Sequence, residues 1–148
     1  MRAWTTRPDY VSVNLVEEDA PDVIAMMVGM GVGVEAGLWS VADAQRFVAL
    51  RVSAGCLRVL IEIIEQEVDG GLAAAAAIIE VLDRAGSALP RLLHGYERTT
   101  WPLVREAWRR GLDTRIGLED VLELPSGERA ADNAALIRAA IGMKPPRA

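Results

Sequence analysis

The chain has 148 residues, 51% of them hydrophobic and 25% charged, a balance typical of a globular protein rather than a disordered one. Its formal net charge is −5 and its arginines are scattered, which argues against nucleic acid or an anionic membrane as a partner. The longest apolar run, 72–79, is too short to cross a bilayer, and a single cysteine excludes an internal disulfide, so a cytoplasmic location fits best.

The first half of the chain alternates short β-rich runs with longer helical runs. Strands are predicted at 10–15, 32–36 and 57–63, and helices at about 19–30, 40–51 and 70–85. The helix starts are assigned from the capping residues Asp19, Ser40 and Asp69, and Gly31 marks the end of the first helix. Ahead of these elements, residues 1–8 have the character of a helix interior that runs into a loop.

The same alternation continues in the second half. Strands are predicted at 91–94 and 113–118. Between them, a helix capped by Thr100 ends at Gly111, and a last helix covers about 132–141. The tail, 142–148, contains two adjacent prolines and is expected to fray.

Five strand–helix units of this length predict an α/β fold with a parallel sheet and right-handed crossovers. No glycine-rich dinucleotide turn and no phosphate-binding P-loop follows any of the strands, so a nucleotide-binding sheet has no support. A complete (β/α)8 TIM barrel has eight strands and typically about 200 residues or more. We therefore predict about five of the eight units of a barrel, in a single domain over 1–148.

Polar residues gather where these strands end, which is where barrels of this kind place their chemistry. They are Asn14, Glu17, Glu35, Glu62, Glu65, His94, Glu97, Arg115, Glu119 and Asp120. The adjacent pair Glu119 and Asp120 is the most informative, because two neighbouring carboxylates that leave a strand point in different directions. One can bind a cation while the other does acid–base work.

Several of these residues have a structural interpretation beside the functional one. Arg115 could neutralise a neighbouring acid inside the barrel, and Glu62 could be satisfied in an ion pair. His94, the only histidine, is either a hydrogen-bonded structural group or a metal ligand. Trp39 either packs in the core or forms a wall of the active site.

A more specific pattern lies at Arg115-Ile-Gly-Leu-Glu-Asp120, followed by Gly127 and by Ala130-Ala-Asp-Asn133-Ala-Ala-Leu136. Together with Ser12-Val-Asn14, Gly33-Val-Glu35 and His94-Gly95 upstream, it resembles the β-keto acid cleavage enzymes. The best-known type of that family is the 3-keto-5-aminohexanoate cleavage enzyme of lysine fermentation. The resemblance extends from about residue 4 to residue 140.

The resemblance implies a zinc-dependent acyltransferase on a TIM barrel. Such an enzyme converts a β-keto acid and acetyl-CoA to acetoacetate and a new acyl-CoA by a retro-Claisen route. By similarity, Glu119 is a zinc ligand, and Asp120 is the base that takes the α-proton, oriented by Arg115. Glu35 and Asn14 line the substrate pocket.

The sequence departs from the family pattern in one respect, because it lacks the H-x-H motif that supplies the family's other zinc ligands. We therefore expect that three strands and this motif precede Met1, and that the chain is the C-terminal portion of the enzyme. A second hypothesis is a non-catalytic barrel remnant that acts through a partner chain or a homo-oligomer supplying strands. A third is a distinct binding module on an open α/β sheet.

Overall fold

The computed structural model describes residues 5–50 and 55–146 of the chain, and in these residues four parallel strands form one sheet. The strands follow chain order across the sheet: β1 (Tyr10–Asn14), β2 (Gly33–Leu38), β3 (Cys56–Ile63) and β4 (Arg91–Gly95). Each strand pairs with the next along the chain, so a helical crossover must separate them.

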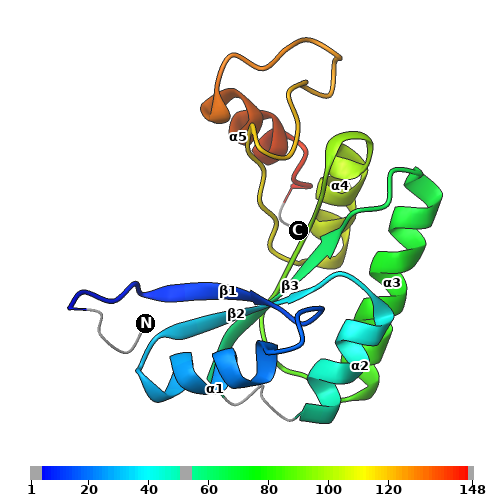
Figure 1. Cartoon of the computed structure of the whole chain (residues 1–148). Coiled ribbons are helices and arrows are strands. Elements are labelled where there is room, and N and C mark those ends of the chain that lie inside the picture. Colours follow the sequence, from blue (N-terminus) through cyan, green and yellow to red (C-terminus); the bar gives the residue numbers. More distant parts are fainter. Residues whose placement is uncertain (1–4, 51–54, 147–148) are drawn as a thin grey trace.

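Five α-helices and one short 3-10 helix lie among the described residues. They are α1 (Ala20–Gly29), α2 (Val41–Leu50), α3 (Val68–Arg84), η2 (Glu97–Thr99), α4 (Thr100–Arg110) and α5 (Asn133–Gly142). The first three α-helices connect successive strands, and α4 follows β4 and packs on it (Figure 1). The predicted α/β class with a parallel sheet is confirmed. None of these helices is long and apolar enough to span a membrane.

One face of the sheet is apolar and is covered by these helices. The residues of this face, such as Val13, Ala36 and Ile61, alternate along their strands and belong to the same buried cluster as Phe47 and Leu82 of the helices. Each fully buried Val, Leu, Ile or Phe side chain stabilises the fold by about 1.5–3 kcal/mol by leaving water. This alternation fixes which face of each strand meets the helices, and hence which side chains lie on the opposite face.

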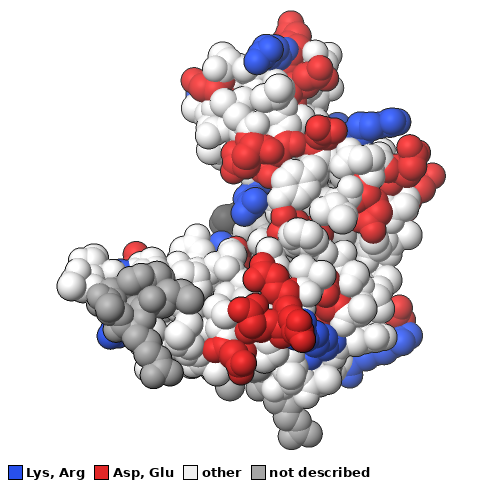
Figure 2. Space-filling view, viewed as in Figure 1, with Lys and Arg blue, Asp and Glu red and all other residues white. Residues whose placement is uncertain are grey.

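The opposite face of the sheet is polar. Its side chains are Ser12 and Asn14 on β1, Glu35 on β2, Arg58 and Glu62 on β3, and His94 on β4, with small or apolar residues between them. In space-filling view the molecule is hollowed between the arm that contains β1 and the lobe that contains α5 (Figure 2). The sheet therefore separates an apolar core from a polar face that bears the candidate site residues of the strands, Asn14, Glu35, Glu62 and His94.

The prediction of a fifth strand at 113–118 is wrong. Only a single bridge joins Asp113 to Leu92 of β4, and residues 114–117 have no regular structure. The Thr114 hydroxyl donates to the Leu93 carbonyl over 2.8 Å, so this carbonyl is already engaged where a continuing ladder would use it. The chain then turns, because the Asp120 amide donates to the Gly117 carbonyl.

The predicted helix starts are partly wrong. Ser40 does cap α2, since its hydroxyl accepts from the Asp43 amide over 3.2 Å. Asp69 instead lies within the first turn of α3, and Thr100 is the first residue of α4, with its hydroxyl donating to the Gly95 carbonyl over 3.1 Å. Gly111 ends α4 in the left-handed conformation, as predicted.

Three predictions fall partly outside the described residues. These are the helix interior at 1–8, of which residues 5–8 are not helical, the end of the second helix at residue 51, and the end of the tail at 147–148.

Candidate functional site

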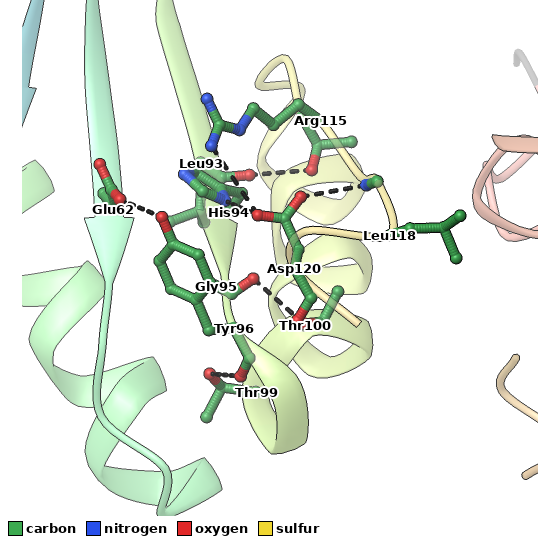
Figure 3. Close-up of polar contacts among 12 residues, drawn as sticks. Glu62, Leu93, His94, Gly95, Tyr96, Thr99, Thr100, Arg115, Leu118 and Asp120 are labelled. Atoms are coloured by element: carbon green, nitrogen blue, oxygen red, sulfur yellow. Dashed lines mark hydrogen bonds and ion pairs between the residues drawn. The ribbon is translucent and has the colours of Figure 1, made fainter. Parts of the chain in front are cut away.

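The site lies at the edge formed by the C-terminal ends of the parallel strands. Glu62 of β3 and His94 of β4 are directly opposite in register. The Glu62 carboxylate accepts a hydrogen bond from the Tyr96 hydroxyl, which Figure 3 shows. It accepts another from the Trp39 indole over 3.1 Å. The buried carboxylate of Glu62 on β3 thus ties together the residue that follows β2 and the residue that follows β4.

Asp120 lies beside this group, at the end of the irregular segment that follows α4. The Asp120 Oδ2 atom accepts from the Gly117 amide over 3.0 Å. Its Oδ1 atom lies 3.6 Å from His94 Nδ1 and 3.8 Å from the Arg115 guanidinium, and has no hydrogen-bond partner among the described residues. One carboxylate oxygen is therefore anchored, and the other faces two nitrogen-bearing side chains without a hydrogen bond.

The backbone holds this aspartate in place. The Glu97 amide donates to the Asp120 carbonyl over 2.7 Å, and the Thr100 hydroxyl lies 3.5 Å from the same carbonyl oxygen. Glu97 and Thr100 belong to the η2–α4 junction that directly follows β4, so Asp120 and His94 are fixed relative to each other by the same local structure.

Burial sets the charge state of both side chains. It raises the pKa of Asp120 to about 6, although the Arg115 charge opposes this effect and the Glu119 and Glu62 charges add to it. Burial also lowers the pKa of His94 to about 3, and the Arg115 charge lowers it further. At neutral pH the pair is therefore a neutral imidazole beside a carboxylate that is mostly ionised, and not a salt bridge.

Glu119 differs from its neighbour. Its side chain is exposed, and its carboxylate folds back over Gly117, close to the place where a larger residue would have its Cβ atom. The adjacent Glu119 and Asp120 therefore present one carboxylate to solvent and one to the interior.

Glu35 and Asn14 lie apart from Asp120. Glu35 is buried between Ser12, whose hydroxyl lies 2.5 Å from its carboxylate, and Arg58, with which it forms an ion pair. Arg58 precedes Glu62 by four residues on β3, about 13 Å at the usual rise per residue. Asn14 ends β1, and its amide oxygen lies against Gly37. The structure brings together Arg115 and Asp120 of the predicted site residues, but not these two.

Two further residues of this site were not predicted. Tyr96 lies two residues after His94, contacts that ring edge-on with centroids 5.3 Å apart, and hydrogen-bonds to Glu62. Thr100 supports both the end of β4 and the Asp120 backbone. The signal for Tyr96 was its spacing from His94, because residues two apart on a strand share a face.

Comparison with protein families gives a match to the beta-keto acid cleavage enzyme model over residues 3–144. The chain belongs to this family. The hypothesis of an unrelated binding module, which required the motif match to be chance, is therefore wrong. No curated protein matches the chain.

Beta-keto acid cleavage enzymes are generally metal-dependent, and the described residues do not fit a resident metal. Among residues 5–50 and 55–146, no three His, Cys, Asp or Glu side chains lie together in a way that could hold an ion. The only histidine faces Asp120, whereas Glu119, the predicted zinc ligand, is exposed and folded over Gly117.

Proposed function

We propose that this chain supplies the proton-transfer groups of a β-keto acid cleavage site, with Asp120 as the base and Arg115 as the cation that orients it. The observation that carries the proposal is the buried Asp120 carboxylate, one oxygen of which has no hydrogen-bond donor and lies 3.8 Å from Arg115. A base needs a free lone pair, and a pKa raised to about 6 lets it accept a proton near neutral pH and release it again.

The reaction that this base would serve begins at the α-carbon of a β-keto acid. Asp120 accepts the α-proton, and the resulting carbanion attacks the thioester carbonyl of acetyl-CoA, which expels the CoA thiolate. The thiolate then attacks the original ketone, and the bond from that carbonyl to the α-carbon breaks. The products are a new acyl-CoA and the acetoacetate carbanion, which takes back the proton from Asp120.

Arg115 has a positioning role in this scheme. The Arg115 side chain is about 40% exposed, whereas the Asp120 side chain is fully buried, so Arg115 connects the buried base to the surface of the site. Its positive charge favours the ionised form of Asp120 and attracts the carboxylate of a keto acid.

The rest of the family's machinery requires groups beyond those that the described residues bring together. We propose that the sheet is part of a (β/α)8 barrel, that its polar face lines the interior, and that the other units come from outside the described residues. The apolar face packed on helices and the polar opposite face support this arrangement. A role for Glu119 in zinc binding, and for Glu35 and Asn14 in the substrate pocket, rests on the family alone.

The first test isolates proton transfer from the rest of the reaction. Acetoacetate in D2O exchanges its α-protons for deuterium, and proton NMR follows the loss of the signal. We expect the wild-type chain to accelerate this exchange above the buffer rate and Asp120→Asn to abolish the acceleration. Glu80→Gln is the control, because it changes a carboxylate that is exposed on α3, outside the site.

A folded wild-type chain that gives only the buffer rate would contradict the proposal. It would favour the remaining hypothesis, a non-catalytic barrel remnant that acts through a partner chain. The unpaired outer edge of β1, which has no neighbouring strand among the described residues, is the feature that a partner would use.

A further inference from the structure

The side chain of His94 is as fully buried as that of Asp120 and has no role in the proposed reaction. Its side chain has no solvent exposure, and neither ring nitrogen has a hydrogen-bond partner among the described residues. A neutral imidazole always has one N–H donor and one acceptor nitrogen. An unpaired donor in a dry interior is costly, so a partner for it is to be expected.

One acceptor in the same place also lacks a partner. The Asp120 Oδ1 atom is buried, has no hydrogen-bond donor, and lies 3.6 Å from His94 Nδ1. This separation exceeds an ordinary N–H···O hydrogen bond, which measures about 2.9–3.0 Å, by roughly 0.6 Å. In Figure 3 the imidazole lies between the Asp120 carboxylate and the Tyr96 ring, on the side of β4 that faces the site.

Both side chains are held on fixed backbone. His94 is in the next-to-last pair of the β3–β4 ladder, opposite Glu62. Asp120 is anchored through its second carboxylate oxygen by the Gly117 amide and through its own carbonyl by the Glu97 amide. A small side-chain rotation is therefore enough to join the two unpaired groups, with no change in the fold.

We propose that His94 is a positioning residue for Asp120, donating its Nδ1–H to Asp120 Oδ1 and so setting the direction of the carboxylate. The catalytic role of this hydrogen bond rests on the proposed function, but the existence of the hydrogen bond does not. With Gly117 on one oxygen and His94 on the other, the carboxylate can no longer rotate, and each oxygen keeps a second lone pair that can accept the substrate proton. A donor to a carboxylate also favours its ionised form, which opposes the effect of burial and keeps the base ready.

The charge state of the imidazole agrees with this role. Its pKa is lowered to about 3, so the ring is neutral and one of its nitrogens must be an acceptor. If Nδ1 carries the proton, Nε2 is that acceptor. The alternative tautomer would place two acceptors, Nδ1 and Asp120 Oδ1, against each other at 3.6 Å.

The decisive experiment uses the fact that the chain has only one histidine. In a long-range nitrogen–proton NMR spectrum of the labelled wild-type chain, all imidazole signals therefore belong to His94, and their nitrogen shifts identify the tautomer. We expect the Nδ1–H tautomer at neutral pH. Asp120→Leu, which removes the acceptor, should shift the population toward the Nε2–H tautomer that a histidine side chain prefers when free in water.

An Nε2–H tautomer in the wild-type chain would overturn the proposal. So would an Nδ1–H tautomer that persists unchanged in Asp120→Leu, because the donor would then serve a different acceptor. Since this spectrum requires no turnover, it decides the hydrogen bond even if acetoacetate exchange is not accelerated. Failure of the proposed function and failure of this inference are therefore distinguishable.

The role of His94 in catalysis is tested with three substitutions of this residue in the acetoacetate exchange assay. His94→Leu removes both nitrogens, His94→Gln places an amide near the position of Nε2, and His94→Asn places one near Nδ1. We expect His94→Leu and His94→Gln to lower the exchange rate by about tenfold to a hundredfold, as for loss of a hydrogen bond to a charged group. His94→Asn should recover part of that loss.

Equal rates for His94→Asn and His94→Gln would contradict the positioning role, because only the former has an amide where Nδ1 lies. Circular dichroism of each variant checks that the fold is retained. Glu80→Gln, an exposed substitution on α3, is the control for handling and concentration.

Discussion

Two groups of charged side chains lie on the same face of the sheet and differ in how fully they are paired. In the middle of β1–β3, Glu35 is bonded to Ser12 and to Arg58, and its carboxylate has no oxygen without a donor. At the C-terminal edge, Asp120 has one bonded oxygen and one that faces His94 and Arg115 without a hydrogen bond. Both acids are almost fully buried.

The difference separates a structural charge from a reactive one. When both oxygens of a buried carboxylate are hydrogen-bonded, these bonds compensate for its lost hydration, and the pair stays together. Asp120 has one oxygen without a hydrogen bond, so less of its lost hydration is compensated. Burial therefore raises its pKa to about 6. Incomplete pairing in a protein interior thus marks the group that is free to exchange a proton.

The largest effect is expected for Asp120→Asn, which keeps the shape of the side chain and removes its charge. The enzyme-dependent rate of acetoacetate exchange should fall by about 10²–10⁴-fold, the usual contribution of a general base. Urea unfolding at neutral pH should show no loss of stability, since the substitution removes a buried charge that is not fully paired. Retained exchange would place the base elsewhere, and incomplete pairing would then not distinguish Asp120 from Glu35.

The opposite pattern is expected for Glu35→Ala. It leaves the Arg58 charge without its partner, and Arg58 is about two-thirds buried, so the free energy of unfolding should fall by roughly 1–3 kcal/mol. The double substitution Glu35→Leu with Arg58→Leu should recover most of this stability, because a buried pair can often be replaced by apolar residues.

Acetoacetate exchange by Glu35→Ala, measured where the variant is still folded, should remain within a few-fold of wild type. A large loss of exchange with unchanged stability would instead place Glu35 in the substrate pocket, as the family resemblance implies. The two assays together decide between a structural and a functional role for this residue.

The sequence predicted the sheet well because one face of each strand is continuously apolar. Runs such as residues 57–63 can only be buried against helices, and their spacing leaves room for one helix between strands. The segment 113–118 has fewer apolar residues than 57–63, and its Thr114 hydroxyl engages the Leu93 carbonyl in place of a backbone amide. Such a competition between side chain and backbone leaves no trace in hydrophobic pattern.

The site could be predicted from the sequence only in part. Arg115 and Asp120 lie within one short motif, so their proximity follows from the chain itself. The pairing of Asp120 with His94, and of Glu35 with Arg58, depends on strand register and on where a turn places its side chains. Because these contacts join residues more than twenty positions apart, the order of residues could not reveal which acids are paired.

A smaller effect is expected at Glu62, a third buried acid, whose partners are the neutral donors Trp39 and Tyr96. The pKa of Tyr96 is raised to about 12, first by burial and then by its hydrogen bond to Glu62. In Glu62→Gln this pKa should fall but stay above 10, because burial remains. The ultraviolet absorbance of the phenolate measures it, with Glu65→Gln as the matched control.

The sign of the accompanying change in stability follows from the same shift. Since the pKa of Tyr96 is higher in the folded chain, its contribution to stability is complete below pH 10 and is lost as the pH rises toward about 12. The decline in that window should be shallower in Glu62→Gln. An unchanged decline would mean that burial alone perturbs Tyr96 and that Glu62 does not organise the edge of the site.

The smallest effect is expected for an ion pair that is neither buried nor part of the polar face. Glu80 and Arg84 on α3 form an i,i+4 pair with side chains 59% and 75% exposed. Glu80→Gln should change the free energy of unfolding by no more than about 0.5 kcal/mol and leave exchange unaltered, because water already solvates both charges. If its effect on stability matched that of Glu35→Ala, burial would not be what distinguishes these pairs. The contrast between Glu35 and Asp120 would then have to be explained by something other than how each is paired in a dry interior.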